Sequence, residues 1–182
     1  MDRKATYTLA VKTIKTAILQ GQYAAAKGSN RIQLATYFAI GKYISLNSRQ
    51  GFWGKGAIET ISEQLRRELP GLRGYSPSNM KNMRLFYEKW SVLDSKSPIA
   101  IGESSEQNST IAIGELQSED YQIDIYRSLS VDNVVDFPIE VFFSVPFTHH
   151  IRILEKTQTQ EERYYYMHRC VMENLSVDGL VK

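Results

Sequence analysis

The chain has little cysteine and no long apolar run. Cys170 is the only cysteine among 182 residues, so no disulfide can form within the chain. No run of about 18 apolar residues occurs, which argues against a transmembrane helix. The N-terminus also lacks the apolar core and the small-residue cleavage site of a signal peptide. These absences predict a cytoplasmic protein with no membrane partner.

Histidine is scarce, and its spacing does not suit metal binding. His149 and His150 are neighbours, and neighbouring side chains project about 100° apart on a helix, so they seldom bind one ion together. His168 and Cys170 complete no zinc-ligand spacing with them. The glycines of 51–56 do not have the spacing of a phosphate-binding loop. We therefore expect no metal, no cofactor and no catalytic residue in this chain.

Charge is divided unevenly along the sequence. Residues 1–90 contain 15 Lys and Arg against 5 Asp and Glu, a net charge of +10, whereas residues 91–182 contain 7 against 15, a net charge of −8. Such asymmetry indicates nucleic-acid or membrane contact on the basic side. The alternative is that the acidic half docks on the basic half of the same molecule.

The apolar spacing predicts a mainly α fold. Apolar residues recur at helical spacing in six segments, 5–26, 31–46, 55–69, 78–90, 147–156 and 160–173. Ser29 or Asn30 is a suitable N-cap for the second of these helices. Gly41 lies inside that helix, where glycine costs about 1 kcal/mol relative to alanine. Close packing against another helix is the expected reason.

The segment 51–90 has the pattern of a helix-turn-helix. Pro70 and Gly71 end one amphipathic helix, and Ser76 followed by Pro77 begins the next, because serine is a favoured N-cap and proline is favoured at the first helical position. A helix-turn-helix places its second helix in the DNA major groove. The predicted fold is therefore a helix-turn-helix, winged-helix-like core with a C-terminal helical pair.

The two faces of the 78–90 helix differ in chemistry. Met80, Met83, Phe86, Tyr87 and Trp90 gather on one side and are expected in the core. Polar residues on the other side and basic residues before the helix are candidates for base and phosphate contacts. The candidate DNA-binding residues are Lys55, Arg66, Arg67, Arg73, Ser76, Ser78, Asn79, Lys81, Asn82, Arg84 and Lys89. The competing explanation is that they are only solvated residues of a surface helix.

Three regions follow from these patterns. Residues 1–90 form the basic helical region, 91–140 an acidic insert, and 141–182 the C-terminal helices, which we expect to pack on the same domain. The insert repeats the pentapeptide Ile-Ala-Ile-Gly-Glu at 99–103 and 111–115. It is expected to be an acidic loop or a short β-hairpin, and 121–143 fits either a strand or a short helix. The chain ends close to the start of a further helix, which suggests a piece of a longer protein.

Part of the chain resembles the N-terminal domain of the YhcG-type bacterial nucleases, once a domain of unknown function. The resemblance covers most of 31–90 and, more loosely, 145–180. It is carried by Ile40-Gly41-Lys42, Gly54-Lys55, Leu65, Leu69-Pro70-Gly71, Gly74-Tyr75-Ser76, Asn79-Met80, Met83-Arg84, Phe86-Tyr87, Phe147-Thr148-His149-His150, Glu161-Glu162-Arg163 and Tyr165-Tyr166.

The resemblance implies a helical DNA-binding module that, in the family, precedes a PD-(D/E)XK nuclease domain. No Asp followed by a Glu-x-Lys motif occurs after residue 90, so the resemblance does not make this chain a nuclease. The leading hypothesis is a non-catalytic module that binds DNA, expected to be double-stranded, and directs a nuclease to it. The alternative is a protein-interaction module that forms a homodimer or docks a nuclease. Leu85, which we expect to be exposed, the aromatic-rich C-terminal helices and the acidic half of the chain motivate it.

Overall fold

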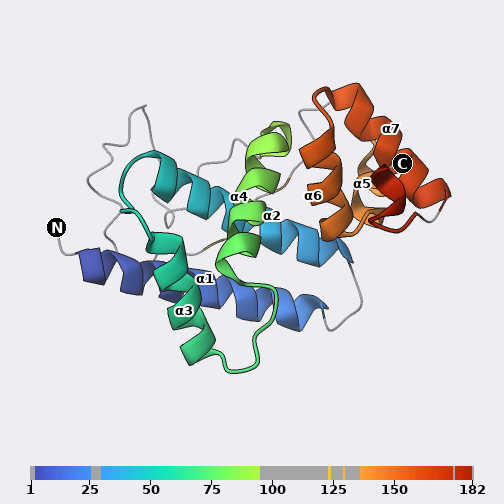
Figure 1. Ribbon diagram of the computed structural model, residues 1–182. Coiled ribbons are helices and arrows are strands. Elements are labelled where there is room, and N and C mark those ends of the chain that lie inside the picture. The colour runs from blue at the N-terminus through green and yellow to red at the C-terminus, as the bar shows by residue number, and fades with distance from the viewer. Residues whose placement is uncertain are drawn as a thin grey trace, which may run out of the picture.

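The computed structural model describes residues 3–25, 30–94, 123, 129, 136–173 and 175–181. This part of the chain is mainly helical, as the sequence predicted, and contains no β-strand (Figure 1). Its helices are α1 (Arg3–Ala25), α2 (Asn30–Arg49), α3 (Ala57–Glu68), α4 (Pro77–Lys89), α5 (Ile139–Ser144), α6 (Phe147–Lys156) and α7 (Gln160–Met172), with short 3-10 helices η1 (Ser91–Leu93) and η2 (Gly179–Val181).

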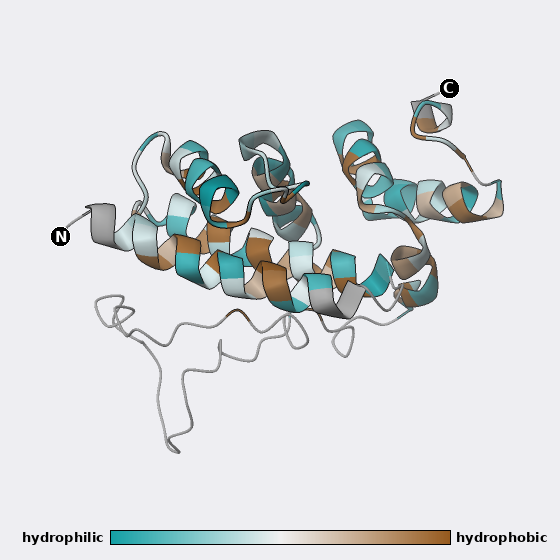
Figure 2. Ribbon diagram, turned by 90° about the horizontal axis from the view of Figure 1, so that it is seen from below, coloured by the Kyte–Doolittle hydropathy of each residue, from teal (hydrophilic) through white to brown (hydrophobic). Residues whose placement is uncertain are grey.

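Helix α2 lies at the centre of the arrangement. It runs back along α1 and packs against α4, while α3 packs on α1 and α4, and α6 packs on α4 and α7. Figure 2 shows α3, α4 and α6 on the same side of the α1–α2 pair. No helix in the described residues is both long enough and apolar enough to cross a membrane. The helix that carries most of the candidate residues, α4, is therefore held between α2, α3 and α6.

Aromatic rings join the N-terminal and C-terminal helices into one core. Phe86 of α4 is fully buried, and its ring centroid lies 6.2 Å from Phe38 of α2, 5.9 Å from Phe142 of α5 and 5.4 Å from Phe147 of α6. Trp90 is also fully buried, with its ring 5.3 Å from that of Phe142. Phe86 and Trp90 were expected in the core from their helical spacing, and that expectation is confirmed.

Gly41 marks the closest approach of α2 and α4. A Cβ atom added to Gly41 would collide with the backbone carbonyl of Met83, in the middle of α4. Only glycine lets the two helix backbones approach this closely. The close packing predicted for Gly41 is confirmed, and it places α4 directly against α2.

Several local predictions need correction. Asn30 is the first residue of α2, and its side-chain amide donates to the carbonyls of Phe143 at 2.7 Å and Val145 at 2.9 Å, so of the two predicted N-caps only Ser29 stays a prediction. Helix α2 also continues to Arg49, beyond the predicted end. Leu85, expected to be exposed, is half-buried.

The ambiguous segment 121–143 ends in a helix, α5, rather than a strand. Asp94 forms an isolated antiparallel β-bridge with Leu129. Ser29 and the repeated pentapeptides at 99–103 and 111–115 lie outside the described residues, as does most of the acidic insert. The predicted hairpin or loop in that insert therefore stays a prediction.

His150 is a neutral base enclosed by the core. It is fully buried on α6 against Phe142, and its Nε2 lies 2.9 Å from the Phe142 carbonyl. Burial lowers the pKa of His150 to about 4, well below the ordinary value near 6.5. Between these pH values the unfolded chain binds a proton that the folded chain does not, so stability falls as the pH is lowered from about 6.5 towards 4.

We expect His150→Phe to reduce this pH dependence by about 1 kcal/mol per pH unit between pH 5 and 6.5. The Phe142 carbonyl keeps the Val145 N–H at 3.3 Å as a donor, so the substitution leaves it partnered. Urea unfolding at several pH values between 5 and 6.5 measures the slope. His168→Gln, at an exposed position on α7, is the matched control and should leave the slope unchanged. Equal slopes for the wild type and His150→Phe would contradict the prediction.

Candidate nucleic-acid interface

Helices α3 and α4 form the unit that the sequence singled out. Helix α3 buries Ile58, Ile61 and Leu65, and exposes its charged residues. The connection from Leu69 to Ser76 is eight residues long, and Gly71 and Gly74 adopt φ values of 84° and 88° within it. Such left-handed backbone favours glycine. Because the common helix-turn-helix has a connection of about three or four residues, that assignment stays a prediction here.

The start of α4 is built as its sequence predicted. The Ser76 side chain caps the helix by accepting from the Asn79 backbone N–H at 3.3 Å, and Pro77 occupies the first position. The Asn79 side-chain amide donates to the Gly74 carbonyl. Ser62 of α3 donates to the Tyr75 carbonyl at 2.8 Å. These bonds hold the connection and set the direction in which α4 leaves it.

The polar side chains of α4 lie towards two different neighbouring helices, α3 and α6. Lys81 pairs with Glu59 of α3 at 2.7 Å, and both side chains are about half exposed. The Lys81 ammonium lowers the pKa of the Glu59 carboxyl through this hydrogen bond. Asn82, the next residue, lines a hollow on the side of α6. The polar residues of α4 thus do not all face one open surface.

Five of the eleven candidate residues have partners inside the protein. Besides Ser76, Asn79 and Lys81, Arg67 pairs with Glu63 at 2.5 Å and Arg84 donates to Ser48 at 3.2 Å. The other six, Lys55, Arg66, Arg73, Ser78, Asn82 and Lys89, have no side-chain hydrogen bond or ion pair within the described ranges. The four basic residues among these six, Lys55, Arg66, Arg73 and Lys89, are all exposed. These four are the charges most available to a polyanion.

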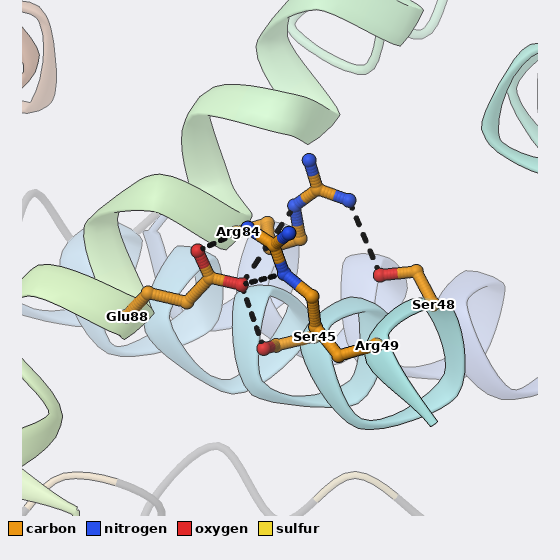
Figure 3. A network of polar contacts seen from close by, with 5 residues as sticks. All are labelled: Ser45, Ser48, Arg49, Arg84 and Glu88. Carbon is orange, nitrogen blue, oxygen red and sulfur yellow. Dashed lines mark hydrogen bonds and ion pairs between the residues drawn. The ribbon is translucent and has the colours of Figure 1, made fainter. Parts of the chain in front are cut away.

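Arg84 belongs to a polar network between α2 and α4 (Figure 3). The Glu88 carboxylate accepts from Arg49 Nε at 2.9 Å and from the Ser45 hydroxyl at 2.9 Å, and lies 3.9 Å from Arg84 Nε. The Arg49 guanidinium lowers the pKa of Glu88. Since Arg84 and Glu88 are only partly exposed, this network serves to join the two helices, and Arg84 is poorly placed to reach a phosphate.

The hollow beside Asn82 lies between α4 and α6 and has a volume of about 240 Å³. Its walls also include Asn79, Arg152, Glu155 and Asp178. Sequence reasoning missed the α6 residues, because that helix was treated only as a packing element. The available signal was the polar stripe of Thr148, Arg152 and Glu155, at positions i, i+4 and i+7 of one helix face.

His149 and Cys170 are engaged in the packing of the C-terminal helices. His149 Nε2 lies 2.9 Å from the Leu175 carbonyl, and Cys170 is a buried free thiol whose pKa is raised by burial. In the part of the chain that the structure describes, no three His, Cys, Asp or Glu side chains cluster as metal ligands would.

The fold and this surface define an all-helical domain whose basic N-terminal half presents unpaired cations around α3 and α4. The family model of the DUF1016 N-terminal domain matches residues 13–107, just over half of the chain. The protein belongs to this DUF1016, or YhcG-type, family. No curated protein and no solved structure shows a significant match. Because the family match ends at residue 107, the looser resemblance over 145–180 stays a prediction.

Proposed function

We propose that this protein is a DNA-binding module that directs a nuclease to its target and has no catalytic role itself. The observation that carries the proposal is the group of exposed cations at Lys55, Arg66 and Arg73, which have no acidic partner in the described residues. They lie in the half of the chain with a net charge of +10. Cations in this state are available to bind backbone phosphates and release counterions.

We propose that the protein is non-catalytic because its cysteine and His150 are buried. Cys170 is buried with a raised pKa, so its thiol is a poor nucleophile. His150 is fully buried in an aromatic core, where a substrate does not reach it. A cytoplasmic location is part of the same proposal, because a free thiol suits a reducing compartment.

Titration of a labelled DNA duplex at several salt concentrations tests the proposal. We expect binding to weaken as salt rises, and Arg66→Ala or Arg73→Ala each to reduce the slope of log K against log salt by about one unit. Arg169→Ala is the control, because Arg169 lies on α7 in an ion pair with Glu173 at 2.7 Å. It should leave the slope unchanged. Binding that is absent or insensitive to salt at low ionic strength would contradict the proposal.

A second candidate function is protein interaction, and the exposed side of α7 favours it. Tyr165 is 59% exposed and Met172 is 83% exposed, and they lie seven residues apart, on one side of the helix. Sedimentation of the pure chain, with and without DNA, separates the two functions. A tight dimer that ignores DNA would favour protein interaction, and a monomer that sediments with DNA would favour the module proposed above.

A further inference from the structure

The hollow between α4 and α6 is the feature that the DNA-binding surface leaves unexplained. Two of the candidate DNA-binding residues, Asn79 and Asn82, line this hollow rather than an open ridge of α4. We propose that it holds one unpaired nucleobase, so that the protein prefers nucleic acid with a base outside the stack. The inference rests on the proposed function, because the backbone on either side of that base must be held by the cations described above.

The size of the hollow suits a single base. Its volume of about 240 Å³ lies below the roughly 300–1,000 Å³ of pockets that take drug-sized ligands, so a small planar ring system fits better than a larger cofactor. Phe147 and Ile151 of α6 contribute apolar surface to its lining and are themselves almost fully buried. Proteins that bind an extruded base place it against aromatic or apolar side chains in this way.

The polar groups of the hollow match the edge of a base. Asn82 has no hydrogen-bond partner in the described residues, so its amide can donate and accept at once, as recognition of adenine requires. The amide nitrogen of Asn79 is engaged with Gly74, which leaves the Asn79 carbonyl oxygen as an acceptor. These groups offer both donors and acceptors to one ligand.

The charge of the hollow favours a base over a phosphate. Arg152 is its one cation, and it already donates to Glu155 at 3.3 Å, while Asp178 adds a second carboxylate. Two carboxylates repel a phosphate, but they accept hydrogen bonds from the amino groups of bases. A base that fills the space between α4 and α6 has left the base stack, because a paired base presents only its groove edges.

Two labelled duplexes of the same sequence test the inference, one fully paired and one with a single unpaired adenine. We expect the full chain to bind the bulged duplex about tenfold more tightly, which is the size of one good base contact. Asn82→Leu, which keeps a similar shape without the amide, should remove this preference. Arg66→Ala should weaken binding to both duplexes equally and so keep their ratio. Thermal unfolding of each variant shows whether it is folded.

The outcomes separate the two proposals. A preference for the bulge that disappears in Asn82→Leu and survives in Arg66→Ala supports the nucleobase site. Equal affinity of the wild type for both duplexes, or a preference unchanged by Asn82→Leu, overturns the site. If binding is then still salt-dependent, the proposed function stands without it. If neither duplex binds in a salt-dependent way, the proposed function fails, and the nucleobase site fails with it.

Discussion

Replacing Phe86 by alanine is expected to lower the free energy of unfolding by about 3–5 kcal/mol, the usual cost of removing a buried aromatic ring. The Phe86 side chain is fully buried, and its ring contacts helices from both ends of the chain, through Phe38, Phe142 and Phe147. The cavity would open between α2 and α4 of the N-terminal half and α5 and α6 of the C-terminal half. The N-terminal and C-terminal helices should therefore be destabilised together.

Urea unfolding followed by circular dichroism and by tryptophan fluorescence measures this effect. Trp53 lies beside Tyr43 of α2, and Trp90 lies among the rings of the C-terminal helices, so fluorescence reports on both regions. We expect one coincident transition by both probes, as in two-state unfolding. Tyr165→Ala is the matched control, because its ring is 59% exposed and its loss should change stability by less than about 1 kcal/mol. A change of similar size in both variants, or two separate transitions, would show that Phe86 does not join the helices.

Replacing Gly41 by alanine is expected to lower the free energy of unfolding by up to about 2 kcal/mol. Two effects oppose each other. Alanine favours the helix over glycine by about 1 kcal/mol, whereas overpacking of a core typically costs about 1–3 kcal/mol and sometimes more. The added Cβ would collide with the backbone carbonyl of Met83 and lie 3.0 Å from the Tyr87 Cβ. A helix backbone cannot yield as a flexible side chain does, so overpacking is the larger effect.

Gly179→Ala is the matched control, because it also adds a Cβ to a glycine but without a close contact. A Cβ at Gly179 would meet no atom closer than 3.5 Å, so that variant should stay within about 0.5 kcal/mol of the wild type. Thermal unfolding of both variants measures the difference. Gly41→Ala should also weaken the proposed DNA binding, since α4 must shift to make room. An unfolding temperature for Gly41→Ala at or above that of the wild type would refute the close approach of α2 and α4.

The candidate site was only partly predictable from the sequence. The capping of α4 by Ser76 follows from residues adjacent in the chain, and it was predicted correctly. The pairing of Lys81 with Glu59 was not predicted, because 22 residues and a turn of unknown path separate them. Asn82 and Arg152 line the same hollow, but they are further apart in the sequence than Lys81 and Glu59, so their proximity was not predicted either.

The sequence by itself determined the helical class, the basic N-terminal half and the residues of the core, such as Phe86 and Trp90. These properties depend on local signals, since apolar spacing and capping residues act within a few turns of chain. The tertiary structure alone decided which cations are paired, which remain exposed, and that a hollow lies between α4 and α6. A side chain on a polar helix face has many possible partners, and only the packing of the helices selects one of them.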